Sequence, residues 1–282
     1  MKIILSPILL IATLLIFNYC FAQSKSITLF GNNPNAGNTL NIRGFNMYYE
    51  TYGSGKPLLI IHGNGGSIKD FENQIPFFSK EFKIIIADNR AQGKSRDPGD
   101  SLSYEMMADD LNGLLDHLHL DSCYVLGWSD GGIDGLLLAM RHPDKVKKLA
   151  ISGANLWPDT TAVDPFVYKW ARDQFQSLKN MKQTPTIKNK LKLANLLTNE
   201  PHISISDLNK VLCPALVIGG DHDILLPQHT LLIASSIRKS YLWIVPNSGH
   251  SAAIYYKDQF NKVVSDFFNK PYREIKEFGR FR

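Results

Sequence analysis

The chain has 282 residues, of which 44% are hydrophobic and 20% are charged. That balance is typical of a soluble globular protein, and the length is sufficient for one large α/β domain. The formal net charge is +5, but no basic block occurs before the tail at residues 270–282. We attribute the charge to a solvated surface, which argues against nucleic-acid binding.

The N-terminal residues predict a secretory signal peptide. A short positive start is followed by an apolar run at residues 3–17, and the small residue Ala22 precedes Gln23. This pattern predicts cleavage between Ala22 and Gln23. Residues 1–22 would then be removed, and residues 23–282 would form an exported domain, periplasmic or secreted, with no stable membrane partner.

Two alternatives for this segment stay open. The apolar run is close to membrane-spanning length, so it could be retained as a membrane anchor. Cys20 could instead carry a lipid. The bulky residues 17–19 before Cys20 disfavour that second alternative, because small residues are expected there.

Export would place the chain in an oxidising compartment. After cleavage only Cys123 and Cys213 remain. Each begins a predicted core strand, and these strands are not neighbours in the expected fold, so both are predicted to be buried, unpaired side chains. A disulfide is not favoured, and no pair of cysteines and histidines has metal-ligand spacing.

The chain then alternates between strand-like and helix-like segments. Residues 31–39 resemble a loop, and two strand-like runs follow it at 40–42 and 45–50, separated by the turn signal Arg43-Gly44. This pair is expected at an antiparallel edge, beside a mostly parallel sheet flanked by helices. The other predicted strands are 57–61, 82–87, 123–126, 146–152, 214–218 and 241–245, and the predicted helices are 104–118, 132–140, 227–237 and 252–268.

One segment breaks this alternation. Residues 155–202 are mostly helical and amphipathic, and they lie between two predicted strands, so we interpret them as a small helical lid. Four aromatic residues are placed on one side of it, and they could form the core of the lid or line a pocket. Core is the default interpretation for each of them: Phe166, Tyr168, Trp170 and Phe175.

The most informative motif is the G-x-S-x-G sequence at residues 127–131, directly after the apolar run 123–126. A strand that leads into this motif and then into a helix is a nucleophile elbow, with the serine at a strained turn. Gly127 and Gly131 approach each other across such a turn, and a side chain at either would clash. Ser129 is therefore the predicted nucleophile.

A serine nucleophile needs a base and a group that orients the base. An acid is expected after the strand 214–218, where Asp221 and Asp223 compete. Asp223 fits better, because its spacing from Gly220 and Pro227 places it at the loop tip before the next helix. Asp221 is expected to make a turn.

The predicted base is His250, which follows the last strand behind a glycine and precedes the last long helix. It would take the proton from the serine and later give it to the leaving group. His62, His142 and His222 are the competing histidines. Of these, His142 precedes a proline and marks a helix end.

The oxyanion hole needs two backbone donors. The N–H of Asp130 is one, and the glycine-rich loop 62–67 after the strand 57–61 supplies the other, with Asn64 as the expected donor. The alternative for this loop is a plain tight turn. Residues 88–95 are interpreted as structural, with Arg90 paired to nearby loop carboxylates and Ser95 packed inside.

Together these residues resemble the α/β-hydrolase superfamily with a short lid, over about residues 40–268. The stretch 126–133, with 153–155 after the next strand, looks like the valacyclovir-hydrolase group, which are serine esterases of α-amino acid esters. That resemblance implies that Asp130 helps to receive a substrate ammonium group, and we expect Trp128 beside it to contact substrate.

Two further groups are similar. One is the enol-lactone hydrolases of aromatic catabolism. The loop 62–64 is also similar to that of haloalkane dehalogenases, which use an aspartate nucleophile, and Ser129 argues against that reaction.

The sequence therefore predicts a serine hydrolase that cleaves a small-molecule carboxylic ester or lactone through an acyl-enzyme. Amide, peptide or carbon–carbon bond cleavage on the same triad is the alternative within hydrolases. A non-catalytic ligand-binding relative is the alternative of another class. The chemistry implies no metal and no organic cofactor, and the sequence does not fix the oligomeric state.

Overall fold

The computed structural model describes residues 29–275. Eight strands form one sheet in the order β1-β2-β4-β3-β5-β6-β7-β8. β1 pairs antiparallel with β2 and β2 antiparallel with β4, and all other pairs are parallel. The strands are β1 (Gly37–Ile42), β2 (Phe45–Tyr52), β3 (Lys56–Ile61), β4 (Phe82–Ala87), β5 (Cys123–Trp128), β6 (Val146–Ser152), β7 (Ala215–Gly220) and β8 (Ser240–Val245).

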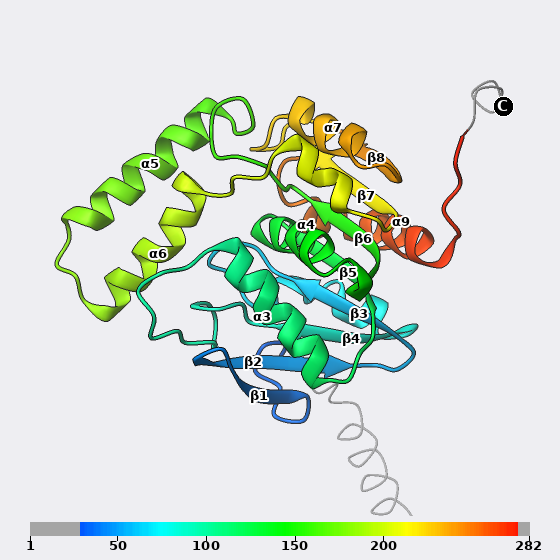
Figure 1. The fold of residues 1–282 in the computed structure, drawn as a ribbon, viewed down its shortest axis with the longest axis horizontal. Coiled ribbons are helices and arrows are strands. Elements are labelled where there is room, and N and C mark those ends of the chain that lie inside the picture. The colour runs from blue at the N-terminus through cyan, green and yellow to red at the C-terminus, as the bar shows by residue number, and fades with distance from the viewer. Residues whose placement is uncertain (1–28, 276–282) are drawn as a thin grey trace, which may run out of the picture.

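Helices cover both faces of this sheet (Figure 1). The core on one face includes α3, α4 and α7, and the core on the other face includes α2, α8 and α9. The helices outside the lid are α2 (Ile75–Phe78), α3 (Tyr104–His117), α4 (Asp130–Arg141), α7 (Pro227–Ser236), α8 (Ala252–Tyr255) and α9 (Lys257–Asn269), with short 3-10 turns η1 (Ile68–Phe71), η2 (Pro143–Lys145) and η3 (Ile205–Lys210).

The two cores explain why the central strands contain continuous apolar runs. In β3, Leu59 and Ile61 belong to one core, whereas Leu58 and Ile60 belong to the other. Successive side chains of a strand point to opposite faces, so a strand covered on both sides needs apolar residues throughout. The predicted α/β-hydrolase fold, with an antiparallel pair at one edge, is confirmed.

Some boundaries differ from those expected. β1 begins at Gly37, inside the segment predicted as a loop, because all its residues pair with β2. The single helix expected at 252–268 is two helices, α8 and α9, with Tyr256 between them in a non-helical conformation. The helix after the elbow begins earlier than expected, at Asp130.

The segment predicted as a lid contains two helices, α5 (Pro165–Asn180) and α6 (Pro185–Asn199), inserted between β6 and β7. They form a hairpin beside the sheet (Figure 1). The expectation that its four aromatic residues share one side is wrong. Phe166 and Trp170 are 78% and 51% exposed, whereas Tyr168 and Phe175 are half-buried. Phe166 and Trp170 are four residues apart and share one face of α5, whereas Tyr168 and Phe175, seven residues apart, share another.

The start of this insertion is held by a buried histidine of α7. Nε2 of His229 accepts a hydrogen bond from the backbone N–H of Leu156 at 3.0 Å, and Trp157 packs edge-on against the ring. An accepting Nε2 requires a neutral ring with its proton on Nδ1. Burial lowers the pKa of His229 to about 4.

This contact predicts a dependence of stability on pH. Between its ordinary pKa of 6.5 and about 4, His229 binds a proton in the unfolded chain but not in the folded protein. The free energy of unfolding is therefore expected to fall as the pH is lowered through this window. Urea unfolding midpoints from pH 7 to 4 measure it. His229→Gln should flatten the profile relative to the wild type, and parallel profiles for the two proteins would contradict the assignment.

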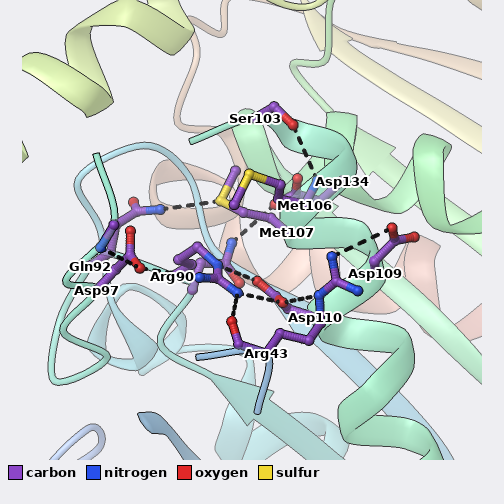
Figure 2. Close-up of polar contacts among 12 residues, drawn as sticks. Arg43, Arg90, Gln92, Asp97, Ser103, Met106, Met107, Asp109, Asp110 and Asp134 are labelled. Carbon is purple, nitrogen blue, oxygen red and sulfur yellow. Dashed lines mark hydrogen bonds and ion pairs between the residues drawn. The ribbon is translucent and has the colours of Figure 1, made fainter. Parts of the chain in front are cut away.

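The predicted structural role of residues 88–95 is confirmed. Arg90 makes a bidentate pair with Asp110 at 2.7 and 2.8 Å and also contacts Asp97 at 3.1 Å (Figure 2). Asp97 lies in the loop before α3, but Asp110 lies on α3 itself, which the sequence did not indicate. Ser95 is fully buried and its Oγ accepts from the N–H of Tyr48.

Arg90→Met is expected to lower the free energy of unfolding by about 3–5 kcal/mol, because it leaves a buried carboxylate without its main partner. The side chains of Arg90 and Asp110 are 5% and 1% exposed. Arg141→Met is the matched control, since Arg141 pairs with Asp109 at 2.8 Å but is 42% exposed. Exposed pairs contribute only about 0–1 kcal/mol. Chemical denaturation measures both variants, and equal losses would refute the argument from burial.

Both cysteines expected after cleavage are buried and free. Cys123 begins β5, and Cys213 precedes β7, with β6 between the two strands. Burial raises the pKa of each thiol to about 12. The predicted signal peptide at residues 1–22, with Cys20, lies outside the described residues. Over residues 29–275, the helices are all too short or too polar to cross a bilayer.

Candidate active site

Ser129 lies at the sharp turn between β5 and α4. Its backbone has φ 57° and ψ −123°, a conformation that side-chain-bearing residues rarely adopt. A Cβ atom on Gly127 would lie 2.1 Å from the backbone oxygen of Gly131, and a Cβ on Gly131 would lie 2.1 Å from that of Ile61. The two glycines of the motif are therefore required sterically, as the sequence predicts.

Three predicted residues meet at the carboxyl ends of the strands. Nε2 of His250 lies 2.9 Å from Oγ of Ser129, and Nδ1 lies 2.7 Å from Oδ1 of Asp223. A carboxylate beside Nδ1 favours the tautomer with its proton there, which leaves Nε2 free to accept from the hydroxyl. The three side chains follow β5, β7 and β8, so parallel strands place them at one edge.

The carboxylate of Asp223 is itself fixed. Its side chain is 2% exposed. Oδ2 accepts from the N–H of Gly220 at 3.3 Å and Oδ1 from that of Leu225 at 3.2 Å. A carboxylate held by backbone donors cannot rotate away from the imidazole ring, so the orientation of His250 is fixed by the loop after β7.

The competing aspartate has a different position. Asp221 is exposed and accepts hydrogen bonds from the backbone N–H groups of Asn247 and Ser248. These bonds, with one from His222, lower the pKa of Asp221 to about 2. It therefore holds the loop before His250, consistent with the turn that the sequence predicts.

The competing histidines are also engaged elsewhere. Nε2 of His62 accepts from the N–H of Asn89 inside the protein, and burial lowers its pKa. His142 lies 2.9 Å from Asp109, and His222 is an exposed neighbour of Asp221.

The glycine-rich loop after β3 lies against Ser129. A Cβ atom on Gly63 would lie 3.0 Å from Cβ of Ser129 and 3.6 Å from its Oγ. Asn64 follows directly, and its side chain donates to Oδ2 of Asp130 at 2.8 Å. The two residues predicted to supply oxyanion donors are thus in contact, one from the loop and one from the first position of α4.

The side chain of Asp130 points into the protein. It is 3% exposed, accepts a hydrogen bond from Asn64 and lies beside the buried side chain of Tyr104. Burial raises its pKa to about 6. Asp134, one turn later on α4, is fully buried, and burial together with Asp130 raises its pKa well above the ordinary value. The carboxylate of Asp130 is therefore already hydrogen-bonded within the protein, to Asn64.

A family model for the alpha/beta hydrolase fold matches residues 56–202, which is more than half of the chain. The chain belongs to this family.

Relatives of this alpha/beta hydrolase include several kinds of hydrolase. The serine hydrolase BPHL of Mus musculus is 29% identical over 268 residues, covering 88% of this chain and 91% of that protein. A 2-hydroxy-6-oxononadienedioate/2-hydroxy-6-oxononatrienedioate hydrolase of Pseudomonas putida is 27% identical, covering 79% and 91%. The solved enol-lactonase of Burkholderia xenovorans LB400 has a TM-score of 0.69 at 20% identity, covering 83% and 100%. The last of these bears on the fold alone.

Two residues support His250 in this alpha/beta hydrolase. The indole Nε1 of Trp128 donates to the backbone oxygen of His250 at 2.9 Å. Gly153, after β6, has φ 66°, and a Cβ there would lie 2.7 Å from Cε1 of the imidazole. Trp128 is predicted to contact substrate, but in the structure its polar atom is bonded to the histidine loop. The sequence singles out residues 153–155 only for the family resemblance, and the contact of Gly153 with the imidazole ring is not predicted.

Proposed function

We propose that this alpha/beta hydrolase cleaves a carboxylic ester or lactone through an acyl-enzyme on Ser129. The observation that supports this most directly is the continuous contact from Asp223 through His250 to the Ser129 hydroxyl, at 2.7 and 2.9 Å. A serine hydroxyl is a weak nucleophile by itself, and a base within hydrogen-bond distance is what activates it.

In the proposed mechanism, Oγ of Ser129 attacks the carbonyl carbon while Nε2 of His250 takes its proton. The tetrahedral oxyanion accepts hydrogen bonds from the backbone N–H groups of Asn64 and Asp130. Collapse breaks the ester bond, and His250 returns the proton to the leaving oxygen. Water, deprotonated by His250, then attacks the acyl-enzyme, and as the bond to Oγ breaks His250 returns that proton to Ser129 and the acid is released. Asp223 stabilises the imidazolium in both halves.

The burial of Asp130 bears on the substrate class. Its carboxylate is buried and accepts a hydrogen bond from Asn64, so a substrate ammonium group would have to compete with this partner. We therefore propose simple esters and lactones ahead of α-amino acid esters.

Carbon–carbon bond cleavage is the second candidate. It is supported by the relative of Pseudomonas putida that is named for hydrolysis of an oxononadienedioate. The same serine and histidine would serve, but the leaving atom would be carbon, which His250 would have to protonate.

A substrate panel tests the proposal. The chain from Gln23 is incubated with p-nitrophenyl acetate, a five-membered and a six-membered lactone, an amino-acid ester, an amino-acyl amide and a 2-hydroxy-6-oxo-dienoate. Fluorophosphonate labelling of Ser129 is followed by mass spectrometry. Turnover fastest on the ester or a lactone supports the proposal. Turnover restricted to the dienoate would favour the second candidate, and binding with neither turnover nor labelling would favour a ligand-binding relative.

We also propose that the chain is exported and cleaved after Ala22, a proposal supported by the sequence alone. Mass spectrometry of the protein expressed in a bacterial host should give an N-terminus at Gln23, in the periplasm or the medium. An intact N-terminus in the membrane fraction, or a lipid on Cys20, would contradict it.

A further inference from the structure

The side-chain amide of Asn64 lies where three segments of the chain meet. Asn64 belongs to the glycine-rich loop after β3. Its Nδ2 atom donates to Oδ2 of Asp130 at 2.8 Å and to the backbone oxygen of Leu193 at 3.1 Å. Asp130 begins α4 and Leu193 belongs to α6. One amide group therefore links the loop, the nucleophile helix and the predicted lid.

The acceptor on α4, the carboxylate of Asp130, is buried among other side chains. Asp130 is 3% exposed, and its carboxylate lies beside the buried side chain of Tyr104 of α3. A carboxylate held in this way cannot follow Asn64 if the loop moves. The bond between Asn64 and Asp130 therefore restrains the loop relative to α4.

The loop needs such a restraint because its backbone is unusually free. Gly63, Gly65 and Gly66 surround Asn64, and Gly65 has φ 67°, a conformation open mainly to glycine. Gly65 is tied through its N–H to the side chain of Gln92 at 2.7 Å. This hydrogen bond holds the loop toward residues 88–95, whereas the amide of Asn64 holds it toward Asp130 at the start of α4.

We propose that the Asn64 side chain is a positioning group that sets the spacing of the two oxyanion donors and couples that spacing to the seating of α6. This inference rests on the proposed function, which assigns the backbone N–H groups of residues 64 and 130 to the oxyanion.

The coupling follows from the geometry. Donors in an oxyanion hole act at about 2.7–3.1 Å from the oxyanion, so a small displacement of one donor removes much of its effect. When α6 is seated, both hydrogens of the Asn64 amide have acceptors. When α6 moves away, the Leu193 carbonyl leaves and one hydrogen bond is lost. The hydrogen bonding of the Asn64 amide is thus complete only while α6 occupies this position.

Asn64→Ala tests the proposal, because it removes both side-chain bonds and keeps the backbone N–H. Since the oxyanion forms in the tetrahedral intermediate and the transition states around it but is absent from the bound ester, kcat for p-nitrophenyl acetate is expected to fall about 10- to 100-fold, with KM changed by less than about threefold. The concentration of active protein is measured by fluorophosphonate titration of Ser129, so that unfolded protein does not enter kcat.

Asn189→Ala is the matched control. The amide of Asn189 also ties α6 to the core, at 2.8 Å from the backbone oxygen of Ala91, but it does not contact the oxyanion loop. Its kcat is expected to stay within about twofold of the wild type. Asn64→Asp is a second variant of equal size that also loses both donated bonds, and its kcat should fall at least as far as that of Asn64→Ala.

The outcomes separate this inference from the proposed function. A wild-type kcat in both Asn64 variants would overturn the inference and leave the serine mechanism intact. An equal fall of kcat in Asn189→Ala would show that any loss of contact between α6 and the rest of the protein lowers turnover. The Asn64 side chain would then have no specific role, and the inference would be overturned. A wild-type protein that neither turns over any ester nor reacts with the fluorophosphonate would overturn the proposed function, and this inference with it.

Discussion

Replacing Ser129 or His250 by alanine is expected to lower kcat by about 10⁶-fold on whichever ester the wild type hydrolyses best. Without Oγ there is no atom to form the acyl-enzyme, and without the imidazole the hydroxyl keeps its proton. The two side chains lie 2.9 Å apart and act on the same proton, so their effects are not additive. The double variant should be about as slow as either single one.

Steady-state kinetics on the three variants measure this, with circular dichroism as the check on folding. Neither Oγ nor the imidazole is needed to hold the elbow, whose geometry depends on Gly127 and Gly131. Folded variants that retain a tenth of the wild-type kcat would exclude Ser129 and His250 as nucleophile and base. A further large fall in the double variant would show that the two act separately.

The second large effect is expected at Asp223. Asp223→Asn is expected to lower kcat by about 10⁴-fold, because an amide can donate to Nδ1 and so favour the imidazole tautomer that cannot accept the serine proton. The side chain is otherwise of the same size, so the loop after β7 should keep its shape. The pH dependence of kcat, measured from pH 5 to 9, should show that no pH restores the wild-type rate.

Asp221→Asn is the matched control for this variant. Both aspartates precede the same helix, but the carboxylate of Asp221 bonds to the backbone of Asn247 and Ser248 and does not reach the imidazole ring. Its kcat should stay within about tenfold of the wild type. If Asp221→Asn proved the slower of the two, the assignment of the acid would be reversed.

The sequence was sufficient for the fold and for the meeting of three side chains, because both depend on local patterns. Continuous apolar runs between helical segments predict a parallel sheet, and a parallel sheet brings the residues after its strands to one edge. Ser129, Asp223 and His250 each follow such a strand. Their contact could therefore be predicted without knowledge of any side-chain conformation.

Contacts that depend on packing between distant segments could not be predicted. The pairing of Arg90 with Asp110 needs the register of α3 against the loop after β4, and the bond from Asn64 to Leu193 needs the position of α6. The exposure of Trp170 likewise depends on which face of α5 meets α6. Helical periodicity gives the faces of a helix but not which of them is covered.

The backbone of Ser129 has a consequence for attempts to make this protein more robust. A residue with a side chain at φ 57° and ψ −123° costs about 1–3 kcal/mol, and glycine would relieve that cost. Random mutagenesis selected for heat resistance alone would therefore favour glycine at position 129, the replacement that removes the proposed nucleophile. Thermal tolerance and turnover have to be selected together here, because the strained backbone belongs to the same residue that supplies the proposed nucleophile.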